Sequence, residues 1–283
     1  MSRPGALAGV FINLERSPQR RASMEAQLAQ ARLPYPVGRL AGIDGSRRAD
    51  CPPGLRAGQF GCWLSHLEAL RGAAPGAHLH VMEDDALLSG ALGALPGIVE
   101  AAEAGSGGDW DLLYLDATLI EVADMYRMYE WARHARERQT VQVHRIPADF
   151  VVYGTHSYVV NAGRRQKVLD FLARHLGAGK PIDNAYAHGI QRGELQAFVS
   201  APFVTSGSDL GIERTVGEVE ERFLAWLLFR RLCFWDLSAQ ELEALQRRLA
   251  GLRAVDGQAA ILGALLGYRI GRWPMQRFPP GLD

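Results

Sequence analysis

The stretch His78-Leu79-His80-Val81-Met82-Glu83-Asp84-Asp85-Ala86 joins a short apolar run to three consecutive carboxylates. Apolar residues of this kind favour a buried strand, whereas three adjacent anions need water, cations or a metal ion. In an open α/β sheet, ligands bind at this kind of junction, just beyond the carboxyl end of a strand. The stretch therefore predicts either a divalent-metal site that holds a nucleotide diphosphate, or an acidic surface turn.

The composition is that of an ordinary globular chain, with room for one large domain or a domain and an appendage. The 283 residues are 48% hydrophobic and 22% charged, unlike disordered or fibrous chains. Lys+Arg and Asp+Glu both total 31, so the basic excess of a nucleic-acid-binding protein is missing. The three cysteines lack paired metal spacing, and no signal peptide or membrane-spanning run is evident. We therefore expect a cytoplasmic protein without a nucleic-acid partner.

Alternating strand and helix signals across residues 1–215 indicate an α/β domain. Residues 10–14 predict a first strand, and Ser17-Pro18 predicts a helix with a hydroxyl cap and a proline in its first turn. The further segments follow the same logic. Strands are expected at residues 37–41, 78–83, 111–116, 141–146, 154–160 and 195–199, and helices at 59–70, 91–104, 123–138, 161–172 and from 181 onward.

Residues 216–283 form the second expected unit, a helical C-terminal extension. Large apolar side chains crowd together between Phe223 and Phe234, beside Arg230 and Arg231. Such a segment fits packing on the domain or on a second copy of the chain, which is the favoured interpretation. The alternative is a basic amphipathic helix that makes peripheral contact with the inner face of a membrane.

Seven short motifs, in chain order, resemble the pattern of glycosyltransferase family 25, which includes lipopolysaccharide and lipooligosaccharide sugar transferases. They cover about the first 210 residues and do not clearly cover the extension. This chain departs from the pattern at Met82, where an aliphatic residue is usual, and at Glu15, where Asp is frequent. The motifs are Ile12-Asn13-Leu14 with Arg16 and Arg20, Asp44-Gly45, Gly61-Cys62 with Ser65-His66, Met82-Glu83-Asp84-Asp85-Ala86, Gly154-Thr155-His156-Ser157-Tyr158, Pro181-Ile182-Asp183, and Ser208-Asp209.

The resemblance implies a GT-A type, Rossmann-like α/β domain with a central, mostly parallel sheet. It also implies an inverting, metal-dependent transfer of a hexose, galactose being the first choice, from a UDP-sugar to a glycan or glycolipid acceptor such as a lipopolysaccharide-type surface glycan. Asp85 is the first candidate ligand for Mn²⁺ or Mg²⁺. Asp84 and Glu83 would be further metal ligands or would bind the ribose, and the sequence does not divide these roles. The residues expected to contact the donor are Asn13, Leu14, Arg16, Arg20, Ser65, His66, Glu83 and Asp84.

Inversion in one displacement needs a base that removes the proton of the acceptor hydroxyl, on the side opposite the leaving group. We expect this base outside the metal cluster. Asp183 is the first choice, and Asp116 and Asp209 are the runners-up. The structural alternative for Asp183 is a carboxylate placed at a helix N-terminus because the helix dipole favours it there.

Several of the other site residues also have structural alternatives. Arg20 fits a solvated helix face as well as a diphosphate contact. Ser65 fits local packing or capping better than a nucleophile. Cys62 and His66 lie four residues apart on one face of the expected helix, which allows a metal pair but favours simple packing against the sheet.

Two other classes of protein compete with the transferase. A non-catalytic binding or scaffold protein would retain the fold without the chemistry, but the intact acidic triplet argues against it. A metal-dependent phosphoesterase would also use clustered acids, but the sequence shows no second cluster of His and Asp with two-metal spacing.

Overall fold

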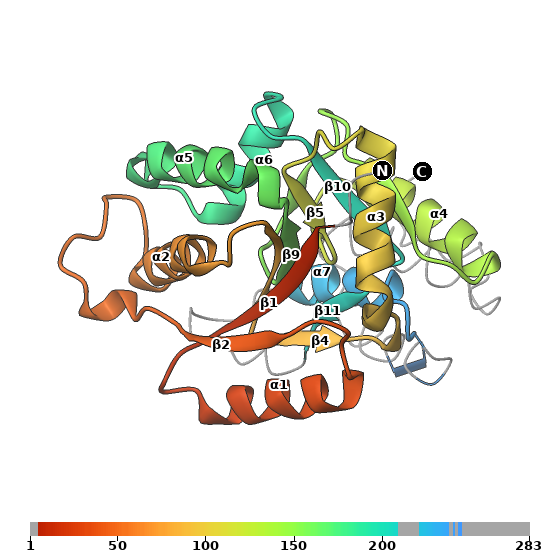
Figure 1. Cartoon of the computed structure of the whole chain (residues 1–283), viewed down its shortest axis with the longest axis horizontal. Coiled ribbons are helices and arrows are strands. Elements are labelled where there is room, and N and C mark those ends of the chain that lie inside the picture. Colours follow the sequence, from red (N-terminus) through yellow and green to blue (C-terminus); the bar gives the residue numbers. More distant parts are fainter. Residues whose placement is uncertain (1–4, 209–220, 238–239, 241–242, 245–283) are drawn as a thin grey trace, which may run out of the picture.

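The computed structural model describes residues 5–208, 221–237, 240, 243 and 244, arranged around a seven-stranded sheet (Figure 1). The strands are β1 (Ala6–Asn13), β2 (Val37–Ala41), β3 (Ala77–Glu83), β4 (Ala86–Leu88), β5 (Leu112–Tyr114), β6 (Thr118–Leu119), β7 (Gln142–Arg145), β8 (Val152–Tyr153), β9 (Ser157–Val160), β10 (Ala197–Ala201) and β11 (Thr205–Gly207). The helices are α1 (Pro18–Ala31), α2 (Ala57–Gly72), α3 (Leu95–Ser106), α4 (Val122–Glu137), α5 (Arg165–His175), α6 (Ile182–Gln191) and α7 (Glu221–Leu232).

The main sheet has the strand order β2-β1-β3-β9-β5-β10-β7. The strands β2, β1, β3, β5 and β10 run in one direction, whereas β9 and β7 run against their neighbours. The predicted α/β class is therefore confirmed, and the sheet is mixed because β9 inserts antiparallel between β3 and β5 and because β7 pairs antiparallel with β10. Two small sheets, β4 with β11 and β6 with β8, lie beside it.

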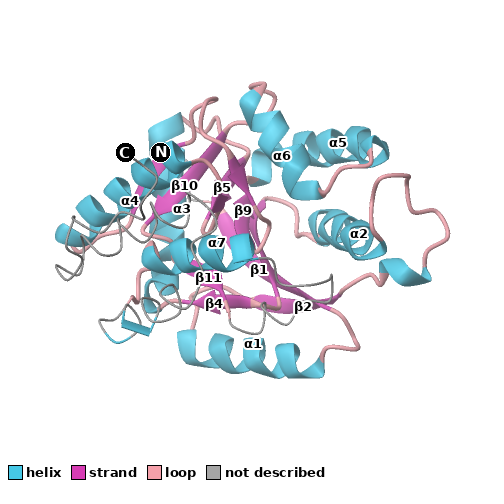
Figure 2. Ribbon diagram, turned by 180° about the vertical axis from the view of Figure 1, so that it is seen from behind, coloured by secondary structure: helices cyan, strands magenta, loops and turns pink. Residues whose placement is uncertain are grey.

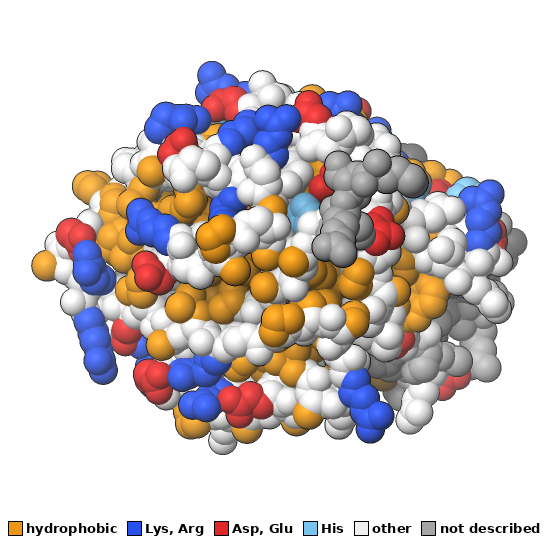
Figure 3. Space-filling view, in the orientation of Figure 1, with side chains coloured by type: hydrophobic (Ala, Val, Ile, Leu, Met, Phe, Trp, Pro, Cys, Tyr) orange, Lys and Arg blue, Asp and Glu red, His pale blue; other side chains and the backbone are white. Residues whose placement is uncertain are grey.

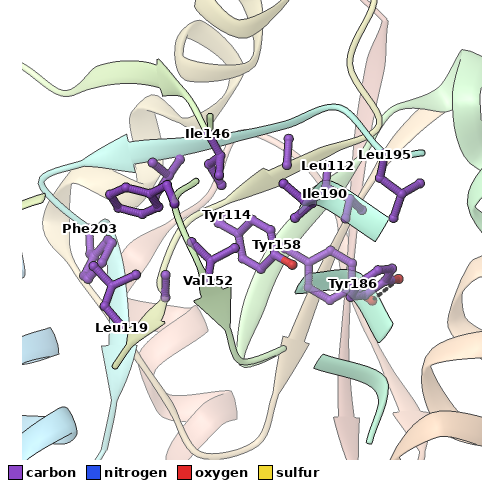
Figure 4. Packing of buried hydrophobic residues seen from close by; sticks show 14 of the residues in the cluster. Leu112, Tyr114, Leu119, Ile146, Val152, Tyr158, Tyr186, Ile190, Leu195 and Phe203 are labelled. Carbon is purple, nitrogen blue, oxygen red and sulfur yellow. Dashed lines mark hydrogen bonds between the residues drawn. The ribbon is translucent and has the colours of Figure 1, made fainter. Parts of the chain in front are cut away.

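Alternation along the strands divides the core into layers on the two faces of the sheet. Leu79 and Val81 of β3 join the larger buried cluster, which also holds side chains of α2, α4, α5, α6 and α7. Figure 4 shows Tyr158 and Tyr186 within this cluster. Met82 packs with α1 on the other face, and α3 covers that face farther along the sheet. Successive residues of β3 therefore point to opposite faces of the sheet up to the acidic triplet.

Local sequence signals account for several element boundaries. Pro18 begins α1 as predicted, but the predicted hydroxyl cap is wrong: Ser17 occupies the cap position without making a side-chain capping bond. Its backbone (φ −114°, ψ 59°) lacks the extended geometry that turns a cap hydroxyl toward the first amides. Asn161 does cap the short turn that follows β9, accepting a 2.9 Å hydrogen bond from the amide of Gly163.

Helix α7 is part of the core of the domain. Leu228, Phe229 and Leu232 belong to the larger cluster, and Figure 2 shows α7 beside β11. For α7, the structure thus shows packing on the domain. The expected boundary at residue 215 and the rest of the extension from residue 245 lie outside the described residues, and they stay predictions.

The surface carries charges of both signs. Figure 3 shows Lys and Arg interspersed with Asp and Glu across one face of the molecule. Tyr126, which is 54% exposed, is the one large hydrophobic side chain that stands out into solvent in the described part of the chain. Within the same ranges, every helix is too short or too polar to cross a membrane.

Candidate functional site

The acidic triplet lies at the carboxyl ends of two parallel strands. β1 and β3 pair in parallel with Ile12 opposite Glu83, so both strands end at the same edge of the sheet. Glu83 is the last residue of β3, and Asp84 and Asp85 form the turn into β4. The amide of Ser208 donates to the carbonyl of Asp85 at 2.8 Å and ties this turn to the end of β11. The triplet thus occupies the position that the sequence predicted.

Glu83 continues the face of β3 that packs under α2. Its Oε1 accepts a 2.6 Å hydrogen bond from the Thr155 hydroxyl and lies 3.5 Å from Nε2 of His66. Burial raises the pKa of Glu83, but the interactions with His66, His156 and Thr155 together outweigh it and hold the pKa below its ordinary value. Glu83 is therefore an ionised carboxylate fixed by groups of the protein.

Asp84 points to the opposite side, toward α1. Asn13 donates to its Oδ2 at 2.6 Å and Arg20 donates to its Oδ1 at 3.3 Å. Burial raises the pKa of Asp84 and the charge of Asp85 adds to this, while the bonds from Asn13 and Arg20 oppose it; the net shift is upward. Arg39 in turn holds Asn13 through a 3.0 Å bond to its side-chain oxygen. Both oxygens of Asp84 are thus already bonded within the protein.

Asp85 is the least satisfied carboxylate of the triplet. Its Oδ2 lies 3.6 Å from Nη1 of Arg20, whereas its Oδ1 is buried and accepts no hydrogen bond from any described residue. One ligand atom each from Glu83, Asp85 and His156 lie within 4.8 Å of one another. An orphaned oxygen beside a second carboxylate and an imidazole fits a divalent cation, and the geometry favours Asp85 as a direct ligand.

Two residues of this site, Thr155 and His156, had no role in the sequence-based prediction. Both lie within the motif Gly154-Thr155-His156-Ser157-Tyr158, just ahead of β9, and the amide of Glu83 donates to the His156 carbonyl at 2.8 Å. In the sequence, these two residues are visible only as a polar pair before an apolar strand. They reach the acidic triplet because β9 pairs with β3, and the sequence alone does not reveal that pairing.

Asp183 lies close to the triplet but outside it. It is in the first turn of α6, and its own Oδ1 accepts a 2.9 Å bond from the amide of Asn184. Burial raises the pKa of Asp183; the charge of Glu83 raises it further, while the Asn184 amide and His156 oppose these effects. The structure therefore brings Asp183 into the electrostatic field of Glu83 and leaves it with a raised pKa.

The runners-up for the base lie elsewhere. Asp116 is buried in an ion pair with Arg230 of α7, which bonds both of its carboxylate oxygens. Because the guanidinium of Arg230 occupies both oxygens of this carboxylate, we assign Asp116 a structural role. Asp209 lies outside the described residues.

Three predicted donor contacts are occupied by local structure. Arg16 pairs with Asp44 at the surface. The Ser65 hydroxyl accepts from the amide of Ile43 at 2.8 Å and donates to the carbonyl of Gly61 at 2.7 Å, so it locks α2 to the loop after β2. The Leu14 carbonyl accepts from the amide of Ser17 at 2.9 Å in the turn before α1. For Ser65, this is the packing role that the sequence also allowed.

Comparison with models of known protein families gives no match, and neither does a search of curated proteins. The structure itself defines an α/β protein with a largely buried acidic site at the carboxyl ends of parallel strands. Any narrower assignment depends on the chemistry of that site and on the motif resemblance.

Proposed function

We propose that this protein is an inverting, metal-dependent glycosyltransferase that moves a hexose from a UDP-sugar to a glycan acceptor. The observation that supports it best is the cluster of Asp85, Glu83 and His156, in which one Asp85 oxygen has no hydrogen-bond partner among the described residues, together with a separate half-buried carboxylate, Asp183, in the electrostatic field of Glu83. Such an arrangement suits a reaction in which the leaving group and the acceptor are served by different carboxylates.

Asp85, Glu83 and His156 would hold Mn²⁺ or Mg²⁺, and Oδ1 of Asp85 is the carboxylate oxygen that accepts no hydrogen bond from the described residues. When bound, such an ion stabilises the charge that develops on a leaving diphosphate. Arg20 adds a permanent positive charge against Asp84 and Asp85. Asn13 and Arg20 together keep Asp84 turned toward α1, so that the turn presents Asp85.

Asp183 would act as the base. The acceptor oxygen bonds to the anomeric carbon, the bond from that carbon to the diphosphate oxygen breaks, and the hydroxyl proton passes to a carboxylate oxygen of Asp183. A raised pKa makes Asp183 a stronger base than an exposed aspartate. We infer UDP-galactose as the donor and a lipopolysaccharide-type glycan as the acceptor from the motif resemblance.

Calorimetric titration with UDP, with and without Mn²⁺, tests the donor site. We expect Mn²⁺-dependent UDP binding in the unchanged protein and its loss in Asp85→Asn. Asp50→Asn is the matched control, because Asp50 is exposed and paired only with Arg48 in the described structure. The absence of UDP affinity with and without the ion would refute the proposal.

A screen of UDP-sugars separates the competing classes. Release of UDP together with transfer or hydrolysis of one sugar supports the transferase. UDP binding without turnover of any donor would favour a non-catalytic protein that keeps the fold. Release of UMP and a sugar 1-phosphate in place of UDP, from hydrolysis of the phosphoanhydride bond, would favour a phosphoesterase-type enzyme.

A further inference from the structure

We propose that Cys62, His66 and Glu83 form a second cation site, for a thiophilic divalent ion such as Zn²⁺. A cysteine sulfur, an imidazole nitrogen and a carboxylate oxygen are the donor types that zinc selects. One such atom from each of the three residues lies within 4.8 Å of the other two. Three protein ligands leave the fourth tetrahedral position to water or to a bound ligand.

His66 supplies the evidence that distinguishes this cluster from ordinary packing. The residue is 1% exposed, and its Nε2 is buried without a hydrogen-bond partner among the described residues. Nε2 lies 3.5 Å from Oε1 of Glu83, whereas N–H···O hydrogen bonds are about 2.7–3.2 Å long. With zinc–nitrogen and zinc–oxygen bonds of about 2.0–2.1 Å, two ligands of one tetrahedral ion lie about 3.3–3.4 Å apart. The spacing therefore suits two metal ligands better than a hydrogen bond.

Neighbouring residues hold these ligands in place. Cys62 and His66 are four residues apart in α2 and share one face of the helix. The Tyr158 hydroxyl is 2.8 Å from Nδ1 of His66, which directs Nε2 toward Glu83. Thr155 donates to the same oxygen of Glu83, Oε1, and so fixes that carboxylate beside Nε2 of His66. Imidazoles that bind metals are usually held at their second nitrogen in this way.

The second site adjoins the first through Glu83, which belongs to both groups. Because a carboxylate has two oxygens, it is able to contribute one to each ion. Binding to Cys62 converts its thiol to a thiolate and releases the proton to solvent. The inference does not depend on glycosyl transfer, since it concerns only cation binding.

Titration of the full, metal-free chain with Co²⁺ tests the sulfur ligand directly. We expect a sulfur-to-cobalt charge-transfer band that Zn²⁺ removes by displacement. The band should be lost in Cys62→Ser and retained in Cys51→Ser, since Cys51 lies in a separate loop. The absence of the band in the unchanged chain, or its survival in Cys62→Ser, would overturn the proposal.

Two further measurements keep this test independent of variant folding and of the first site. X-ray absorption at the zinc edge of the unchanged protein should show one sulfur in the coordination sphere, and a shell of nitrogen and oxygen alone contradicts the proposal. Asp85→Asn should keep the cobalt–sulfur band even though it loses Mn²⁺-dependent UDP binding. Loss of both signals in Asp85→Asn would mean that there is a single site, which rules out the second one.

Discussion

Replacing Arg230 by methionine tests whether α7 is required for the core beneath the acidic site. Arg230 donates from Nε to Oδ1 of Asp116 at 2.8 Å and from Nη2 to Oδ2, and the two side chains are 2% and 1% exposed. Removing one partner of a buried ion pair typically costs about 3–5 kcal/mol, because the other charge stays behind uncompensated. We therefore expect Arg230→Met to lower the free energy of unfolding by about 3–5 kcal/mol.

Replacing the other partner of the pair, in Asp116→Asn, should lower the free energy of unfolding by less than Arg230→Met does. Burial lowers the pKa of Arg230, but the charge and bonds of Asp116, and then the charges of Asp85 and Glu83, outweigh this and raise it. In Asp116→Asn, the guanidinium of Arg230 still feels the negative charges of Asp85 and Glu83. It can also donate a hydrogen bond to the amide oxygen of the new side chain. In Arg230→Met, Asp116 loses the cation with which it is paired, and no other ion pair to it is formed within the described part of the chain. The double variant should be more stable than Arg230→Met alone, since neither charge remains buried without its partner.

Urea denaturation followed by circular dichroism measures these differences. At about 2–4 °C per kcal/mol for a domain of this size, Arg230→Met should also lower the melting temperature by about 6–20 °C. Arg48→Met, in an exposed pair with Asp50, is the control and should leave the transition unchanged. A loss below about 1 kcal/mol in Arg230→Met, the range of an exposed pair, would show that the buried pair does not hold α7 to the domain.

Two further substitutions address the base and the packing of α2. Asp183→Asn should abolish transfer while stabilising the fold at neutral pH. The folded-state pKa of Asp183 is raised, so its ionisation destabilises the native state above that pKa. The stability gained by Asp183→Asn should therefore shrink as the pH falls through the folded-state pKa of Asp183. Urea denaturation at neutral and acidic pH measures this, and equal stability of the two proteins at neutral pH would contradict the prediction. Gly61→Ala should cost about 1–3 kcal/mol, because an added methyl would lie 2.4 Å from the Ile43 carbonyl and 2.7 Å from the Gly45 amide. Gly72→Ala, at the open end of the same helix, is its control and should cost nothing in the same denaturation assay.

The sequence was sufficient to place the acidic site on the fold. An apolar run that stops at three carboxylates indicates a buried strand with a polar end, and β3 ends at Glu83 as that pattern requires. The proline signals for α1 and α6 also hold, since Pro18 begins α1 and Pro181 precedes α6. These features are local, and local physics determines them.

The direction of β9 was not predictable in the same way. A short apolar strand reads alike in either direction, and its orientation depends on how the chain arrives. Gly154, at φ +95°, allows a backbone turn that other residues rarely adopt. β9 then runs antiparallel to β3 and β5. That pairing brings the backbone of His156 to Glu83, which no spacing rule in the sequence would suggest.

The division of labour within the triplet follows from where its partners come from. Alternation alone sends Glu83 and Asp84 to opposite faces, but it does not say which faces carry cations or hydrogen-bond donors. Those groups arrive from separate elements: His66 from α2, Arg20 from α1, and Arg230, through its charge, from α7. Glu83 and Asp84 are matched by their own neighbours, and Asp85 at the turn keeps one oxygen that nothing in the described structure bonds. The sequence therefore predicts that cations are needed near the acidic triplet. Which of the three carboxylates keeps an oxygen without a partner is determined only by the folded arrangement.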